Sequence, residues 1–463
     1  MKNLPLYPAL LFTLGLLLAS GTQARATEPA PAVWSAEEAV RFALANSPDS
    51  QMGRQRIEAA QAAIVLEKSA AYPQLSLVGQ YGQTNNPMYS FGNILNQHEF
   101  SQGINFNHVG RTDDLNNSLQ LGYRFFDGGR SQAGLHAAEA GAAASRFELT
   151  AVQERLAFEV VQAFHLIEQC EEKIKIAQAE TESVAAALAY AQARFEEGVL
   201  LHSEVLDLEV QQARTREARL LARHDLARAQ LIFLNLLGLT GGEVHIAPEP
   251  ATAQETPSAD TPGKRAELAS LDAQLSAAQE RLRQTRAGRY PSLDGYAAYG
   301  VDQGSITGGD GNFWQAGIKL QYNLFDGHRQ EAETARASAG LSEIGELRRK
   351  TELAIGLEIS QARLTLGDAE ERLALSAQSV TSAEESLRIK RERFAEGLLL
   401  ATDLIDAQNR LTETQLNRSQ AEISRKIAVA ALRRAEGLPQ FGEVAGSSFD
   451  SASTAKSIMP NSQ

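Results

Sequence analysis

The segment ARFEEGVLLHSEVLDLE (193–209) returns in recognisable form as ERFAEGLLLATDLIDAQ (392–408). Both copies hold an Arg-Phe pair, a glycine three residues later, and an apolar run with acidic residues, and they lie 199 residues apart (393 − 194). Two further landmarks recur at the same interval, namely Phe-Asp-Gly at 126–128 and 325–327 and Gly-Leu at 238–239 and 437–438. Three landmarks at one offset indicate an internal duplication.

The two halves differ in length near their beginnings. Tyr72-Pro73 returns as Tyr290-Pro291, displaced by 218 residues (290 − 72), which is 19 more than the other landmarks. The first half therefore carries an insertion, and the polar run at 84–114, rich in Asn, Gly and His, is predicted to be an inserted loop.

Each half predicts a short helix, two strands around a loop, a very long helix and a shorter helix. Residues 51–71 and 264–289 are rich in helix-favouring Ala, Gln, Glu, Leu and Arg, and both stretches end at Tyr-Pro, where proline cannot continue a helix. Residues 130–196 lack proline and place apolar side chains at three- and four-residue steps. Such a helix would be about 100 Å long, so it cannot lie within a bilayer but can cross a periplasm.

Four strands are predicted near 73–83, 115–126, 291–299 and 313–325. Apolar and polar residues alternate along them, so each strand has one apolar and one wet face. A sheet packed on a soluble core is one interpretation of this pattern, and strands facing lipid are another. About eight strands are needed to close a barrel, and an open edge in lipid leaves backbone groups unpaired, so a membrane role requires several copies of the chain.

Aromatic side chains gather where the strands meet the helices. In a membrane they are expected to form a ring at the periplasmic interface, and on a soluble sheet they would cap it. The five residues are Tyr72, Phe125, Phe126, Tyr290 and Phe325.

The ends of the chain and its middle have their own compositions. A basic start, an apolar stretch and Ala24-Arg25-Ala26 predict a signal peptide at 1–26 and export from the cytoplasm. The first repeat is expected at 27–247 and the second at 263–438. The proline-rich segment 248–262 is predicted to link them, and the polar tail 439–463 is predicted to be disordered.

Charge and reactive residues argue against several function classes. With 44 basic and 57 acidic residues, the net charge of −13 argues against a nucleic-acid partner bound through its phosphates. Cys170 is the only cysteine, and its repeat counterpart is Ala369, so it is interpreted as a small buried residue. His98 and His108 lack the spacing of metal ligands. No metal, cofactor or catalytic set is predicted, and hence no enzyme.

The signal peptide, the duplicated helix and strand order, the Tyr-Pro and Phe-Asp-Gly landmarks and the repeated Arg-Phe-x-x-Gly segments together resemble the TolC family of outer-membrane efflux proteins, the outer membrane factors. The resemblance covers about 34–438. It implies an α+β membrane protein in which long antiparallel coiled-coil hairpins form an α-helical barrel. It also implies that four strands per subunit contribute to a 12-stranded β-barrel in a homotrimer.

The same resemblance implies a function and a location. The trimer would be the passive exit duct of a tripartite efflux or type I secretion system for drugs, metal ions or proteins, the cargo class staying open. It would lie in outer-membrane lipid of a Gram-negative envelope with a large periplasmic portion. An inner-membrane transporter would supply energy, and a periplasmic adaptor would join the two.

Family members close the periplasmic mouth with acidic side chains, and the matching positions are Asp403 and Asp406, with Ser203 and Glu204 from the neighbouring hairpin. Three copies of each carboxylate would attract cations and respond to pH. In the other interpretation, Ser203 and Thr402 are helix N-caps, and the acids favour the helix dipole.

One position departs from the family pattern. Leu399 stands where an arginine is expected, so an arginine-centred lock of the closed state is not predicted. The rival function is a periplasmic coiled-coil adaptor or scaffold. It would explain the export signal and the long helices but leave the four amphipathic strands without a purpose.

Overall fold

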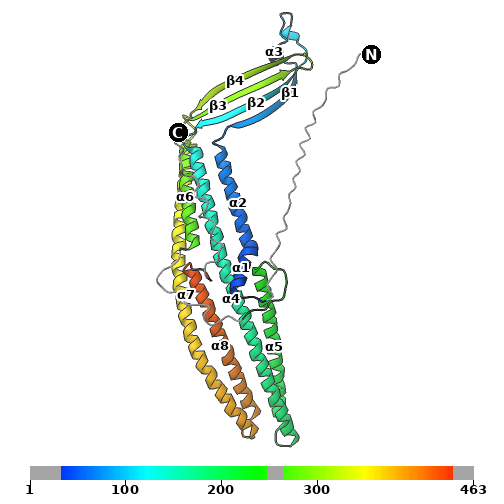
Figure 1. Cartoon of the computed structure of the whole chain (residues 1–463), viewed down its shortest axis with the longest axis vertical. Coiled ribbons are helices and arrows are strands. Elements are labelled where there is room, and N and C mark those ends of the chain that lie inside the picture. Colours follow the sequence, from blue (N-terminus) through cyan, green and yellow to red (C-terminus); the bar gives the residue numbers. More distant parts are fainter. Residues whose placement is uncertain (1–32, 248–263, 442–463) are drawn as a thin grey trace, which may run out of the picture.

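The computed structural model describes residues 33–247 and 264–441. The molecule is elongated, with a sheet at one end and helical hairpins that run away from it (Figure 1). The signal peptide and the linker expected at 1–26 and 248–262 lie outside the described residues, as does most of the tail expected at 439–463. No helix in the described ranges is both long enough and apolar enough to cross a membrane.

The sheet has four antiparallel strands in the order β1-β2-β3-β4. These are β1 (Gln74–Thr84), β2 (Thr112–Phe126), β3 (Ser292–Gln303) and β4 (Asp310–Gln321). The four-stranded sheet expected from the alternating segments is therefore present.

The last strand stops earlier than its sequence pattern indicates. β3 begins at Ser292, directly after Pro291, and Ser292 is the residue that pairs with Gln321 at the end of β4. Beyond this point β4 has no partner strand within the protomer, so Phe325 lies outside the sheet although the strand was expected to reach it. In contrast, β2 extends to Phe126, which pairs with β3 across a bulge.

The strand register sorts the side chains onto two faces. One cross-strand row is apolar and exposed in the protomer, and consists of Leu77, Leu119, Tyr299 and Trp314. A row on the opposite face is polar, and consists of Gln80, Asn116, Asp302 and Gly311. An exposed apolar face opposite a polar one is the arrangement that lipid-facing strands require.

Paired helices repeat between the two halves. α4 and α7 have 67 residues each, α5 and α8 have 35 each, and the starts of α4 and α7 are displaced by 199 residues (329 − 130). Helices of 67 residues are about 100 Å long, as expected. The repeated helices are α2 (Pro48–Ser69), α4 (Arg130–Glu196) and α5 (His202–Leu236) in the first half, and α6 (Ala266–Ala287), α7 (Arg329–Ala395) and α8 (Ala401–Ala435) in the second.

The first half contains an additional helix, α1 (Ala36–Asn46), whereas the sequence pattern predicts only one short helix before the strands. Ser35 caps α1 in a reciprocal capping box with Glu38. The buried ring of Trp34 packs edge-on against Phe42 and Phe233, with centroids 5.3 and 6.0 Å away. Trp34 and α1 thereby pack against the middle of the helical bundle (Figure 1).

The insertion between β1 and β2 is more ordered than a polar loop. It holds α3 (Pro87–Asn96) and the short 3₁₀ helix η1 (Phe106–His108), so its interpretation as a loop alone was wrong. Asn86 caps α3 by accepting a hydrogen bond from the Met88 amide, and Pro87 occupies the first helical position, where its missing N–H costs nothing.

Candidate gate at the tips of the helical hairpins

The α4–α5 and α7–α8 turns have the same backbone geometry. Gly198 and Gly397 each follow the end of a long helix with φ of +74°, a left-handed conformation that glycine adopts without steric cost. The Gly198 amide donates to the Phe195 carbonyl at 2.9 Å, and the Gly397 amide to the Phe394 carbonyl at 3.0 Å. The conserved geometry explains why glycine recurs in both copies of the quoted segment.

The helices after these turns begin earlier than the capping interpretation requires. The N-caps are Leu201 and Leu400, and neither end has a side-chain cap. Ser203 and Thr402 are already inside the first turns of α5 and α8 and are exposed. The N-cap role suggested for these two side chains was therefore wrong.

An apolar cluster joins the two hairpin tips. Val205 and Leu208 of α5 are buried in it together with Leu404 of α8 and Phe394 of α7. Leu399 is partly buried and packs against the same cluster. An apolar side chain thus contributes packing between the hairpins at the position where an arginine was expected from the family.

A cavity of about 380 Å³ lies beside this cluster, and its lining includes Glu204 and Asp403 from the two hairpins. Glu204 is only 9% exposed, and its Oε2 atom has no hydrogen-bond partner in the described part of the chain. A buried carboxylate oxygen without a partner is energetically costly, which is typical of functional sites.

The structure separates the four predicted gate residues into two pairs. Glu204 and Asp403, which occupy equivalent repeat positions, line the same cavity. Asp406 and Ser203 are exposed and lie outside that lining. Within one protomer, only the first pair is therefore brought together.

A polar contact between the hairpins was not among the predicted features. The Tyr190 hydroxyl donates a hydrogen bond to the Ala395 carbonyl oxygen at 2.5 Å, and Arg194 Nη2 donates to the same oxygen at 2.9 Å. Arg194 Nε also donates to the Tyr190 hydroxyl at 2.8 Å. Both side chains come from α4, and they satisfy the C-terminal end of α7, where helix carbonyls otherwise lack partners.

A difference between the two repeats in the sequence points to this contact. The counterpart of Tyr190 in the second half is Ile389 (190 + 199), which has no hydroxyl group. Arg194 is conserved between the halves as Arg393, but only Arg194 reaches the end of the other hairpin. The first hairpin therefore holds the second through Tyr190, which the duplication does not share, and through Arg194, which it does.

Farther from the tip, polar side chains continue the contact between the hairpins. Ser183 donates to Gln408 Oε1 at 2.7 Å, and Arg391 donates to the Ser183 hydroxyl at 2.7 Å. Glu180 lies one turn away and is buried. Burial raises the pKa of the Glu180 carboxyl above its ordinary value, and hydrogen bonds with Thr412 and Gln211 offset only part of that rise.

The five predicted interface aromatics all lie at the junction of the sheet and the helices and are exposed in the protomer. The Phe125 ring covers Gly295 on the apolar face, where an added Cβ would come within 2.4 Å of it. The Tyr290 side chain packs against Gly128 at the start of α4. The exposed members of the set are Tyr72, Phe125, Phe126, Tyr290 and Phe325.

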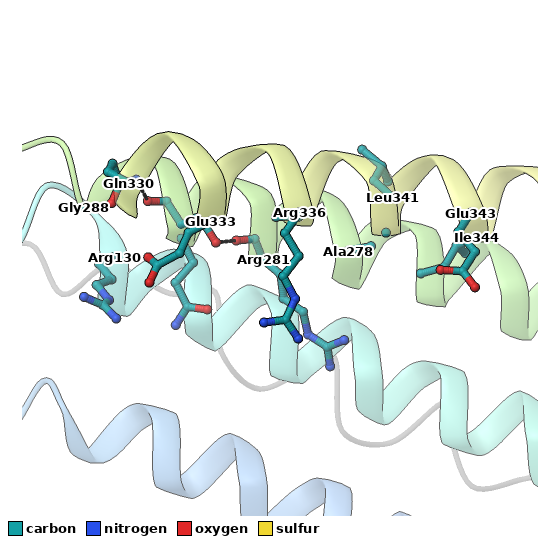
Figure 2. A pocket seen from close by; sticks show the side chains of 14 residues that line it. Arg130, Ala278, Arg281, Gly288, Gln330, Glu333, Arg336, Leu341, Glu343 and Ile344 are labelled. Carbon is teal, nitrogen blue, oxygen red and sulfur yellow. Dashed lines mark hydrogen bonds between the residues drawn. The ribbon is translucent and has the colours of Figure 1, made fainter. Parts of the chain in front are cut away.

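A larger cavity of about 780 Å³ lies between α4, α6 and α7 near the sheet. Figure 2 shows Arg130, Arg281 and Arg336 spread along it. Gln330 crosses from α7 to donate to the Thr285 carbonyl at 2.5 Å. The described lining contains neither histidine nor cysteine, and it offers no arrangement of nucleophile and base.

Metal-binding geometry is not found among the described residues, where no three His, Cys, Asp or Glu side chains are placed to hold an ion. His98, in the insertion, instead donates from Nδ1 to the Asp310 carbonyl at 3.1 Å. Cys170 is buried in the apolar core between α1, α4 and α5, as its repeat position indicates.

The outer membrane efflux protein family model matches residues 39–239 and 262–438. The TolC outer membrane protein of Vibrio cholerae is 23% identical over 422 residues, which cover 88% of this chain and 92% of that protein. Protein CyaE of Bordetella pertussis is 26% identical over 366 residues, covering 75% of this chain and 70% of CyaE.

The crystal structure of the outer membrane protein VceC of Vibrio cholerae has the same fold. It superposes with a TM-score of 0.72 at 19% identity, covering 88% of this chain and 96% of VceC. The TolC-like channel fold predicted from the sequence is thereby confirmed. The chain belongs to the outer membrane efflux protein family, whose members are channels of the outer membrane with a helical portion in the periplasm.

Proposed function

We propose that three copies of this chain form a passive exit duct, and that the hairpin tips are its periplasmic gate. The observation that carries the proposal is the pairing of Glu204 and Asp403 in one cavity between the two hairpins, beside the bridge from Tyr190 to Ala395. Carboxylates at a convergent mouth select for cations. The bridge has to break for the hairpins to move apart.

The trimer is supported by the open edges of the sheet. β1 and β4 each pair on one side only, and the apolar face that includes Leu77 and Trp314 is exposed. Four strands do not close a barrel, whereas twelve strands from three copies leave no edge in lipid. The polar face would then line the lumen.

The partners follow from the family and from the passive nature of a duct. An inner-membrane transporter supplies the energy, and a periplasmic adaptor contacts the helical hairpins. The named relatives include TolC of Vibrio cholerae and a pyoverdine export protein of Pseudomonas aeruginosa. The duct carries out no chemistry of its own and exports drugs, metal ions or proteins. The rival adaptor role leaves the apolar sheet face without a function.

Single-channel recording tests the gate. Replacing Asp403→Ala together with Asp406→Ala is expected to raise the conductance of trimers in planar bilayers and to weaken their cation selectivity. Glu396→Ala is the control for the loss of one carboxylate near the hairpin tip, because Glu396 is an exposed acid at the end of α7 outside the cavity lining. Unchanged conductance and selectivity in the double variant would remove the gate assignment.

A further inference from the structure

The insertion between β1 and β2 folds back over one particular face of the sheet. Gly311 belongs to the polar row with Asp302 and Asn116, so a side chain at position 311 would point to the polar face. A Cβ built on Gly311 would lie 1.8 Å from the Asn96 carbonyl oxygen, at the end of α3. The backbone of the insertion therefore lies directly against the polar face.

The side chain of Gln97 stabilises this contact through hydrogen bonds. This side chain is fully buried, and its Nε2 donates to the Asp113 carbonyl at 2.8 Å and to Asp114 Oδ1 at 2.9 Å. Its Oε1 accepts a hydrogen bond from the Thr307 hydroxyl in the β3–β4 loop. One amide thus joins the insertion to β2 and to the neighbouring hairpin.

Neighbouring contacts hold the same assembly together. The Asp113 carboxylate accepts hydrogen bonds from the Ser305 and Ile306 amides at 3.0 and 2.7 Å, which orders the β3–β4 loop. Asp302, which pairs with Gly311, is only 2% exposed and accepts a hydrogen bond from Asn116 at 2.6 Å. Buried polar groups that are hydrogen-bonded to one another favour one arrangement of the insertion and the β3–β4 loop.

We propose that residues 85–111 form a cover on the lumen face at the outer end of the duct, a second constriction at the opposite end from the hairpin tips. The inference rests on the proposed trimer, because only closure of the sheet turns its polar face into a lumen. In a closed barrel the polar face is concave, so three covers extend inward around the exit. Release of the Gln97 contacts opens the exit.

Chemical labelling from outside the cell tests the cover. Gln315 lies on the polar face below Gly311 and is exposed in the protomer, so Gln315→Cys reports access through the mouth. The native thiol is removed by Cys170→Ala, matching Ala369 in the other repeat. Intact cells are treated with a bulky, membrane-impermeant maleimide, and labelling is normalised to the amount of trimer.

Gly311→Ala places a Cβ where the Asn96 carbonyl lies, and we expect it to speed labelling about tenfold, the effect of losing one or two hydrogen bonds of the cover. Gly82→Ala is the matched control, because Gly82 is on the same face of β1 with nothing within 4 Å of an added Cβ. Gln97→Ala removes the Gln97 hydrogen bonds without a steric clash at the backbone contact. We expect it to speed labelling as Gly311→Ala does.

The outcomes separate the cover from the duct itself. If Gln315→Cys reacts equally fast with and without Gly311→Ala and Gln97→Ala, in trimers that conduct ions, the cover is refuted and the duct stands. If purified trimers show no conductance in any variant, the duct is refuted whatever the labelling rates are.

Discussion

The Tyr190 hydroxyl of α4 and the Ala395 carbonyl of α7 form a 2.5 Å hydrogen bond that links the two helical hairpins at their tips. Arg194 donates to the same carbonyl at 2.9 Å. The contact unites the last turn of one long helix with the end of its repeat counterpart. Any outward movement of the α7–α8 hairpin relative to α4 has to break both hydrogen bonds.

Removal of this bridge is predicted to open the channel. Tyr190→Phe and Arg194→Ala together remove bonds worth about 1 kcal/mol each, which shifts a closed-to-open equilibrium by roughly tenfold or more. Single-channel recordings of the double variant should therefore show more frequent or longer openings than the unmodified trimer.

Arg393→Ala is the control for the bridge, because Arg393 is the repeat counterpart of Arg194 and is exposed. If both substitutions change the open probability equally, the effect comes from lost positive charge and not from the bridge.

Glu180 is predicted to make stability depend on pH. Burial raises the folded-state pKa of this carboxyl, so its ionised form weakens the folded state at neutral pH. As the pH falls through the folded-state pKa, protonation of Glu180 removes this penalty. The penalty is absent below the unfolded-state pKa of about 4.3. Glu180→Gln should therefore raise the unfolding temperature at pH 7.5 and have no effect below about pH 4.

The exposed neighbour Glu182 provides the matched charge change for this measurement. Glu182→Gln should leave the unfolding temperature of the detergent-solubilised protein almost constant across the same range. An equal gain from both substitutions would show that net charge, not the burial of Glu180, sets the dependence.

Arg265 is predicted to be the strongest single polar contributor to the stability of the helical bundle. Its side chain is 6% exposed and binds Glu267 at 2.8 Å, Glu358 of α7 at 3.1 Å and the Ala435 carbonyl at the end of α8 at 3.0 Å. Arg265→Met leaves these partners unpaired and should lower the free energy of unfolding by about 3 kcal/mol.

Thermal or denaturant unfolding in detergent measures this loss. Arg283→Met is the control, because Arg283 is largely exposed and binds only Glu280 among the partners described, so a much smaller loss is expected. Equal losses from the two substitutions would contradict the central role of Arg265.

An added charge is predicted to be tolerated on the polar face of the sheet but not on the apolar face. Leu77 lies on the exposed apolar face of β1, and Leu77→Arg would place a cation in hydrocarbon at a cost of about 2 kcal/mol or more. Ser76→Arg introduces the same charge on the polar face of the same strand. We expect the amount of trimer in the outer-membrane fraction to fall for Leu77→Arg and to be kept for Ser76→Arg.

Features that depend on local pattern could be predicted from the sequence. Tyr-Pro at 72–73 and 290–291 marks the ends of α2 and α6, because proline cannot continue a helix that precedes it. Gly198 and Gly397 mark the hairpin turns, because only glycine adopts φ of +74° freely. Alternation likewise identified the strands, since the side-chain period of a strand is two.

Features that depend on tertiary contacts could not be predicted in this way. The strand expected at 313–325 includes Phe325, but Phe325 lies outside the sheet because β3 starts too late to pair with it. The burial of Glu204 and the exposure of Asp406 follow from how two hairpins pack, although both residues lie in similar sequence contexts. The capping signals Asn86 and Pro87 were present in the insertion, yet its polar composition concealed α3.

In the proposed duct the apolar face of the sheet contacts lipid, and the association of three copies closes the barrel. Native mass spectrometry of the purified protein in detergent, combined with a crosslinking series, measures the number of copies. We predict a single species of three copies that precipitates or aggregates when the amphiphile is removed. A monodisperse single copy that remains folded in buffer without amphiphile would rule out the trimeric barrel.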